Sequence, residues 1–265
     1  LAERLSERSI AYYHGGMETV DRLKIQQQFM NDQIDIICST SAFGMGINKR
    51  NIRFIIHYHL PTQIESYIQE IGRAGRDGKD SVSVLLYKDG DEKLPYRIIE
   101  NEVPNEEELT FIFQQLYRFY QEGKVLPLNE SEIESIFQVD ETKWRLVYYH
   151  LEKNGITSER NIIYSKPNWE ETFQKMLQFR NERIKTKKLA IDEMKKWIHS
   201  TSCLRIGLYE RFEQPVKTKK EQCCSNCGFS FQTWLSEEEQ KYEEMPVQTW
   251  QEKLASILQI GEINE

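Results

Sequence analysis

The sequence has few cysteines and lacks long apolar runs. Five cysteines in 265 residues are too few for a disulfide scaffold. Four of them fall in one segment, which indicates a reducing compartment and suggests a metal site. The longest uncharged stretches, within 36–49 and 54–65, contain polar residues or proline. They fall short of the roughly 18 apolar residues that a membrane span needs. No internal repeat or low-complexity tract is present. These absences exclude secreted disulfide-rich, membrane-spanning and fibrous classes and favour a globular protein.

The net charge of −7 is unevenly distributed. Residues 91–169 carry 9 basic and 15 acidic side chains, whereas residues 170–222 carry 13 basic and 8 acidic ones. A basic band between acidic flanks fits a polyanionic partner. A solvated helix face rich in lysine explains the same band equally well.

Residues 1–90 alternate between strand and helix patterns. We predict strands over 10–13, 34–38, 52–58 and 81–87, and helices over 19–30 and from Thr62 to about residue 70. Thr62 and Glu65 match a capping box. Short links between these elements predict βαβ units and one parallel sheet, with Cys38 in its core. Residues 2–9 read as the end of a helix with no strand before it. We therefore expect a fragment of a longer protein whose domain lacks its first strand.

The remaining chain divides into three further regions. In 96–168 we predict helices over 106–122, 131–137 and 143–154, Gly155 as a C-cap, and a strand over 161–164; this order resembles a winged helix. The apolar helix 144–151 in acidic surroundings favours a packing module over a DNA reader. In 169–234 we predict a mainly helical domain with basic helices over 170–199 and from about 202 to Pro215. Residues 235–265 read as an acidic helical tail.

The densest motif runs from Gln69 to Gly78 and contains two arginines three residues apart. The glycines allow a tight turn, and two permanently charged guanidinium groups suit the charge of a transferring phosphoryl group. The alternative is a structural turn in which Arg73 and Arg76 pair with Asp77 and Asp80.

Two other segments follow predicted strands, His14-Gly-Gly16 and the loop Thr40–Lys49. Ligands of parallel sheets bind at the carboxyl ends of strands, and small residues let backbone amides approach a phosphate. We expect these segments and the arginine motif to share one edge of the sheet. Taken singly, each also fits an ordinary loop.

Together these segments resemble the RecQ family of superfamily-two DNA helicases. The resemblance rests on Tyr13–Gly16, Thr40–Lys49, His59–Pro61, Ile64–Tyr67 and Gln69–Gly78, and it resumes over about 175–227. It implies that residues 1–95 form the second RecA-like domain of a motor. It implies an arginine finger at Arg76, a partner on the γ-phosphate at Arg73 and a coupling role for Gln69. Nucleotide-side positions are Gly46, Asn48 and Gly72, and phosphates of the tracked DNA strand would be held by His14, Arg22 and Thr40.

The resemblance also implies what must come from elsewhere. The chain contains neither a Gly-x-x-x-x-Gly-Lys-Ser/Thr loop nor an Asp-Glu-x-His box, so the cradle for ATP and Mg²⁺ belongs to a first RecA-like domain. We expect the chain alone to be inactive and, with that domain, to act as a monomeric 3′-to-5′ helicase on single-stranded and forked DNA. The expected roles are DNA repair and recombination, in the cytoplasm or nucleus and without a membrane partner. Alternatives are a non-enzymatic DNA-binding scaffold and an RNA helicase.

The cysteine-rich segment predicts a zinc site. Cys224 and Cys227 have a spacing that suits tetrahedral thiolate coordination, and Cys203 and Cys223 complete a set of four. Because Cys223 and Cys224 are adjacent, one of them is a candidate to be spared, with His199 as a substitute ligand. A vicinal disulfide or reduced core cysteines are the rivals. Beside this zinc platform, Arg180 and Arg183 of the basic helix are candidates to contact duplex phosphates. About 70 residues separate the two parts that resemble RecQ, which departs from the usual pattern.

Overall fold

The computed structural model describes residues 8–40, 43, 47–210, 221–232 and 234–235. The chain divides into two compact units, 1–196 and 197–265. Within the described residues, no helix is both long and apolar enough to cross a membrane. Residues 2–7 of the helix expected over 2–9, the helix end at Pro215 and residues 236–265 of the acidic tail lie outside these residues.

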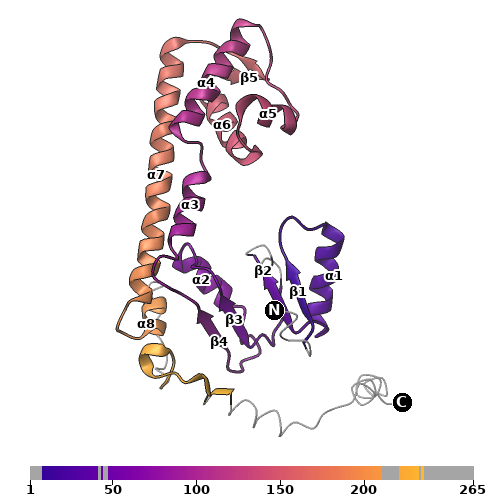
Figure 1. Ribbon diagram of the computed structural model, residues 1–265, viewed down its shortest axis with the longest axis vertical. Helices are drawn as coiled ribbons and strands as arrows, with labels where there is room; N and C mark the ends of the chain where they lie inside the picture. Colours follow the sequence, from indigo (N-terminus) through magenta and orange to yellow (C-terminus); the bar gives the residue numbers. More distant parts are fainter. Residues whose placement is uncertain (1–7, 41–42, 44–46, 211–220, 233, 236–265) are drawn as a thin grey trace, which may run out of the picture. The chain divides into compact units, whose positions relative to one another are not determined.

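The first ninety residues form βαβ units (Figure 1). Strand β1 (Ile10–Tyr13) pairs in parallel with β2 (Ile36–Ser39), and helix α1 (Thr19–Met30) connects them. Strand β3 (Phe54–His57) pairs in parallel with β4 (Val82–Leu85), and α2 (Ile64–Ile71) connects these two. The predicted order and parallel direction are confirmed.

The expectation of one continuous sheet is wrong for the described residues, because the strands β1 to β4 form two separate two-stranded pairs. Local patterns identify strands, but which strands become neighbours depends on long-range hydrogen bonding. Strand β1 has the predicted bounds, whereas β2, β3 and β4 are shorter than predicted. Cys38 is exposed rather than part of a core.

The predicted cap of α2 is also wrong. The helix begins at Ile64 behind Gln63, whose side chain makes no capping hydrogen bond. Ile64 and Tyr67 are both buried, so burial of the helix's apolar side sets its start two residues beyond Thr62. The predicted end is confirmed, since Gly72 is the C-cap.

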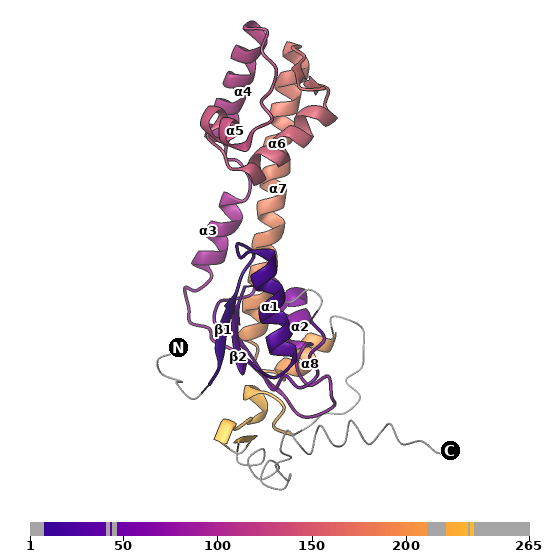
Figure 2. The same cartoon turned by 90° about the vertical axis from the view of Figure 1, so that its right-hand side faces the viewer.

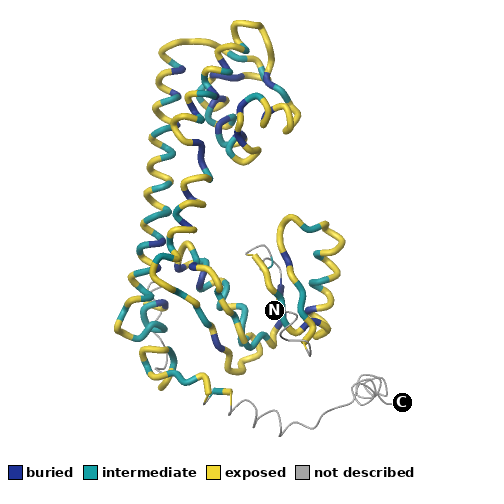
Figure 3. Tube along the Cα trace, viewed as in Figure 1, coloured by how far each residue is buried: buried dark blue, intermediate teal, exposed yellow. Residues whose placement is uncertain are grey.

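Residues 105–165 form a helical module whose core also includes Trp169 and Met176 of the helix that follows it. Helices α4 (Glu106–Gln121), α5 (Glu130–Phe137) and α6 (Glu141–Lys153) match the predicted helices within two residues. The C-cap of α6 is Asn154, one residue before the predicted Gly155. Gly155 follows it with a φ of +69° and donates its amide to the Glu152 carbonyl, as glycine commonly does just after a C-cap. Strands β5 (Thr157–Ser158) and β6 (Asn161–Ile162) form a short antiparallel hairpin. Buried positions recur along the elements of the module (Figure 3). Their side chains form one core cluster that includes Leu116, Phe137, Val147 and Leu151.

An antiparallel pair of helices, one before the module in the chain and one after it, joins this module to the α/β region. Helix α3 (Lys93–Asn101) runs beside α7 (Lys166–Ile198), a 33-residue helix that begins four residues before the predicted start (Figure 2). Polar contacts between the two helices form an antiparallel ladder. From one end to the other, the partners are Glu92 with Lys195, Tyr96 with Asp192, Glu100 with Lys188, and Glu102 with Lys187.

The second unit contains α8 (Leu204–Tyr209) and a short 3-10 helix, Ser225–Cys227. The Trp197 indole donates to the Leu204 carbonyl over 2.9 Å and so fixes the start of α8. The described cysteines of this unit stand at the ends of these two helices.

Candidate nucleotide, DNA and metal sites

Arg76 follows α2 in an exposed turn and is held by uncharged acceptors. Its Nε donates to the Gly72 carbonyl over 3.2 Å. Its Nη1 donates to the Asn48 side-chain oxygen over 3.0 Å and to the Ile47 carbonyl over 3.3 Å. Three predicted site residues, Gly72, Asn48 and Arg76, are therefore brought together. Neutral partners orient the guanidinium group without cancelling its charge.

Asp77 does not serve as the partner of Arg76. The carboxylate of Asp77 instead accepts from Arg53 over 2.5 Å, and Arg53 also donates to the Asp80 carbonyl over 2.8 Å. The hydrogen bond from Arg53 is the main reason why the pKa of Asp77 is lowered. Gly75 has a φ of +65° and donates its amide to Ile52 over 3.0 Å. The two residues before β3 thus hold the turn that carries the arginines in place.

Helix α2 is fixed to its sheet by two polar contacts. The His57 ring and the Glu70 carboxylate are 2.8 Å apart, and the hydroxyls of Tyr67 and Ser83 are 2.9 Å apart. Both contacts lie on the inner side of α2, whereas Gln69 is exposed. Arg73 is half-buried at the end of the helix. The two anchors set the orientation in which α2 presents these residues.

His14 and Thr40 lie next to each other at the carboxyl ends of β1 and β2. Tyr13 is paired with Ser39, and the Thr40 amide donates to the Tyr13 carbonyl over 3.2 Å. Both His14 and Thr40 are exposed. Arg22, in the second turn of α1, donates to Thr19 over 3.2 Å, while its Nε is buried without a hydrogen-bond partner. Gly46 lies outside the described residues.

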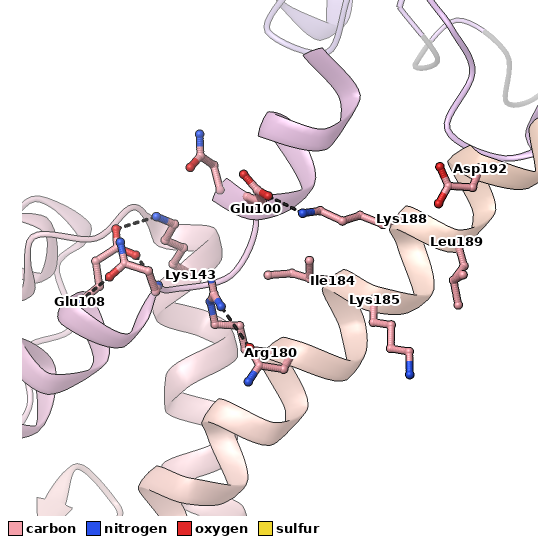
Figure 4. Close-up of a pocket in the computed structure, with 12 residues that line it drawn as sticks. Glu100, Glu108, Lys143, Arg180, Ile184, Lys185, Lys188, Leu189 and Asp192 are labelled. Atoms are coloured by element: carbon pink, nitrogen blue, oxygen red, sulfur yellow. Dashed lines mark hydrogen bonds and ion pairs between the residues drawn. The ribbon is translucent and has the colours of Figure 1, made fainter. Parts of the chain in front are cut away.

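The basic face of α7 is largely occupied by carboxylates of its own chain. Lys188 extends toward Glu100, whereas Lys185 points away from α3 (Figure 4). Arg183 lies 3.9 Å from Glu102, and Arg180 donates to Asn181 over 3.2 Å. A pocket of about 570 Å³ beside Arg180 has both acidic and basic lining residues. The two arginines predicted to contact DNA thus lie in a partly neutralised environment.

The four predicted cysteine ligands converge in the second unit. The sulfur atoms of Cys203, Cys223, Cys224 and Cys227 all lie within 4.8 Å of one another, and His199 is not part of this group. In a tetrahedral site with zinc–sulfur bonds of about 2.3 Å, neighbouring sulfurs lie roughly 3.8 Å apart, so the donor set fits one zinc ion.

The thiols of this group share protons unequally. Burial alone raises the pKa of Cys203, but the Ile206 amide and the thiols of Cys223 and Cys227 outweigh it and lower that pKa to about 7. The Cys203 and Cys224 thiols raise the pKa of Cys227 to about 12. The lowered pKa of Cys203 favours the thiolate form, which is the form that binds zinc.

Sequence reasoning missed two basic residues that shape the arginine site. Arg53 interrupts an apolar strand pattern. Lys49 is a buried residue that follows the exposed Asn48. For Arg53 the available signal was a single charge between the apolar residues Ile52 and Phe54, because such a charge requires a partner when the strand is buried. Lys49 stands beside Arg50 in a polar stretch, so no such signal marked it.

Comparisons with known proteins agree with this geometry. Residues 1–78 match the family described as helicase conserved C-terminal domain. The probable ATP-dependent DNA helicase RecS of Bacillus subtilis is 37% identical over 264 residues, which covers 96% of this chain and 48% of the relative. The ATP-dependent DNA helicase RecQ of Haemophilus influenzae is 50% identical over 93 residues, 34% of this chain and 15% of the relative. The chain belongs to the RecQ family of superfamily-two helicases.

Within this family the chain corresponds to a C-terminal portion and spans about half the length of the RecS relative. Because that match covers 96% of the chain, it includes the helical module. Among solved structures, the C-terminal domain of the DEAD-box protein Dbp5 is 23% identical, with a TM-score of 0.30 over 37% of this chain and 58% of that one. A score this low does not establish a shared fold.

Proposed function

We propose that the chain is the nucleotide-sensing and DNA-holding half of an ATP-dependent DNA helicase. The observation that carries this proposal is Arg76, exposed and oriented by Gly72, Ile47 and Asn48 with no carboxylate among these partners. A guanidinium group held in this way is ready for an anion supplied by another domain. The curated RecS and RecQ relatives are named as ATP-dependent DNA helicases.

In this proposal a first RecA-like domain contributes the cradle for ATP and Mg²⁺, and this chain closes the other side. Arg76 stabilises charge that develops on the γ-phosphate, with Arg73 beside it and Gln69 linking the nucleotide to α2. Asn48, Gly72 and Gly46 lie on the nucleotide side. His14, Thr40 and Arg22 hold phosphates of one DNA strand, so their contacts are independent of sequence and sensitive to salt.

The four cysteines hold one zinc ion in the proposed protein. Their donor set of four sulfurs is that of a closed structural site, which supplies folding energy rather than chemistry. Arg180 and Arg183 of α7 are the proposed duplex contacts. A 3′-to-5′ direction and roles in repair and recombination belong to the same proposal and rest on the family resemblance.

The decisive experiment joins this chain to a first RecA-like domain of the family. We expect ATP turnover stimulated by single-stranded DNA, unwinding of duplexes with a 3′ tail, and no turnover by the 265-residue chain alone. Stimulation by RNA instead would indicate an RNA helicase. DNA binding without turnover would indicate a scaffold, and either result would overturn the proposal.

The zinc part is tested by metal analysis of the purified chain. We expect one zinc per chain, and Cys224→Ser should abolish stoichiometric zinc and lower the melting temperature of the second unit. Cys38→Ser is the matched control, because Cys38 is an exposed cysteine of β2 in the first unit. Full zinc occupancy in the Cys224 variant would show that this cysteine is spared.

A further inference from the structure

Lys49 is the one charged residue that is buried in the described part of the chain, with an exposed fraction of 7%. Lysine is rarely buried to this degree, and its ammonium group must find partners to offset the loss of water. The residues that supply those partners therefore indicate what Lys49 does.

The ammonium group of Lys49 binds the end of α1. It donates to the Phe29 carbonyl over 2.7 Å and to the Asp32 carboxylate over 2.5 Å, and it lies 4.9 Å from the centre of the Phe29 ring. The last carbonyls of a helix lack partners within the helix and carry partial negative charge. The C-terminus of α1 thus accepts one cation from the loop that follows β2.

On its other side, the same short segment holds Arg76. Ile47 and Asn48, the two residues before Lys49, both accept hydrogen bonds from the Arg76 guanidinium group. Ile47 is 8% exposed, so the backbone on this side of Asn48 is fixed as well. Because peptide units are rigid, the anchor at Lys49 limits where the Asn48 side chain can lie.

Phe43, near the start of the loop that follows β2, also packs against Phe29 at the end of α1. The Phe43 ring lies 5.6 Å from the Phe29 ring and 4.9 Å from the Tyr13 ring. Phe29 therefore contacts the loop at both Phe43 and Lys49, and the loop is attached to α1 on either side of the segment 44–46. Arg22, a proposed DNA contact, belongs to α1 as well.

We propose that Lys49 is a positioning residue for Arg76. By binding the end of α1 it fixes Asn48, and Asn48 in turn orients the guanidinium group that meets the nucleotide. This inference rests on the proposed role of Arg76 in ATP hydrolysis. It gives the path by which the arginine site and the helix that carries Arg22 are mechanically connected.

The test uses the chain joined to a first RecA-like domain, with saturating single-stranded DNA. Lys49→Met removes the ammonium group but keeps most of the apolar side chain. We expect kcat for ATP to fall roughly tenfold or more, while KM for ATP changes by less than about twofold, because orientation rather than binding is lost. Lys24→Met is the control, because Lys24 is an exposed lysine of α1, and it should leave both constants unchanged.

Repeating Lys49→Met in an Arg76→Ala background separates positioning from simple destabilisation. If Lys49 acts through Arg76, it should cause almost no further fall in kcat there, whereas an equal fall in both backgrounds would overturn the inference. Should Lys49→Met fail to fold, Asp32→Asn carries the same test, since it keeps the bond to the Phe29 carbonyl. If Arg76→Ala itself leaves turnover intact, the proposed function fails instead.

Discussion

Two groups of cations in this chain meet opposite kinds of partner. At the end of α2, Arg76 donates to two backbone carbonyls and one amide oxygen. Along α7, the lysines donate to carboxylates of the α3 segment, with Lys195 bound to Glu92 and Lys188 to Glu100. The first arrangement preserves a positive charge for a ligand, and the second consumes it within the fold.

The contrast between Arg76 and the lysines of α7 shows that the number of charges in a segment does not give the number available to a ligand. Along the sequence, the basic band of 170–222 and the acidic region before it look like two separate regions, and the basic one looks available to a polyanion. In three dimensions the carboxylates of the α3 segment are bound by the lysines of α7. Exposed ion pairs contribute only about 0.2–1 kcal/mol each, so the ladder aligns the helices more than it stabilises them.

The largest expected effect comes from removing the charge that the fold leaves uncompensated. In the chain joined to a first RecA-like domain, Arg76→Ala should lower DNA-stimulated ATP turnover by about 10³-fold, the usual effect of an arginine that stabilises a phosphoryl-transfer transition state. The measurement is steady-state ATP hydrolysis at saturating DNA.

Arg183→Ala is the matched control, since it removes the same group from α7, where Glu102 already lies 3.9 Å away. With single-stranded DNA as the stimulant, its turnover should stay within about twofold of the original, because Arg183 is proposed to contact duplex phosphates and not the nucleotide. If both variants lost ATP turnover equally, Arg76 would not differ in function from the cations of α7.

Much of the fold followed from local patterns. Helical spacing of apolar residues located α1, α4, α5, α6 and most of α7, and Gly155 and Gly72 marked helix ends, because each of these signals acts within a few residues. The pairing of strands and the start of α2 did not follow. Burial of Ile64 and Tyr67 set that start over the local capping signal of Thr62.

For the candidate sites, the sequence identified residue types better than their partners. The adjacency of His14 and Thr40 and the gathering of four cysteines were expected from strand order and cysteine spacing. The hydrogen bond between Asn48 and Arg76 was not predicted as a contact, because the two motifs were only expected to share one edge of a single sheet. The ion pair between Arg53 and Asp77 was not expected, because the two residues are 24 positions apart in the sequence. No local pattern specifies which carboxylate a distant arginine will bind.

A middle-sized effect should come from releasing the cations of α7. Glu100→Gln with Glu102→Gln frees Lys188 and Lys187, so the chain should bind forked DNA several-fold more tightly. The slope of log affinity against log salt should steepen by about 0.9 for each new phosphate contact. Fluorescence anisotropy over a salt series measures both.

Net charge alone would also strengthen DNA binding, so the control changes it equally. Glu106→Gln with Glu107→Gln removes two exposed acidic residues from the first turn of α4. If this control steepens the slope as much as the α3 pair does, the ladder does not occupy the α7 cations in solution.

The smallest effect concerns the pH dependence of the ladder. The hydrogen bond from Lys195 is the main reason why the pKa of Glu92 is lowered from 4.5 to about 2. A carboxyl group whose folded-state pKa is depressed stabilises the fold above its unfolded-state pKa, and this stabilisation is lost as the pH falls toward the folded-state pKa. The contribution of Glu92 should therefore be complete above pH 4.5 and disappear between pH 4.5 and about 2.

Thermal melts of the 265-residue chain over this pH range test that expectation. Other carboxyl groups with lowered pKa values, such as Glu100 and Asp77, also contribute to the acid dependence, so the informative quantity is the difference made by Glu92→Gln. That variant should melt below the original chain near neutral pH, and the gap should close as the pH approaches 2. Glu152→Gln, which alters an exposed carboxylate of α6, should produce no such convergence. If the difference in melting temperature stayed constant across the range, Glu92 would stabilise the pair of helices α3 and α7 by packing rather than by charge. The ladder would then not be a place where the fold neutralises cations, in contrast to the arginine site.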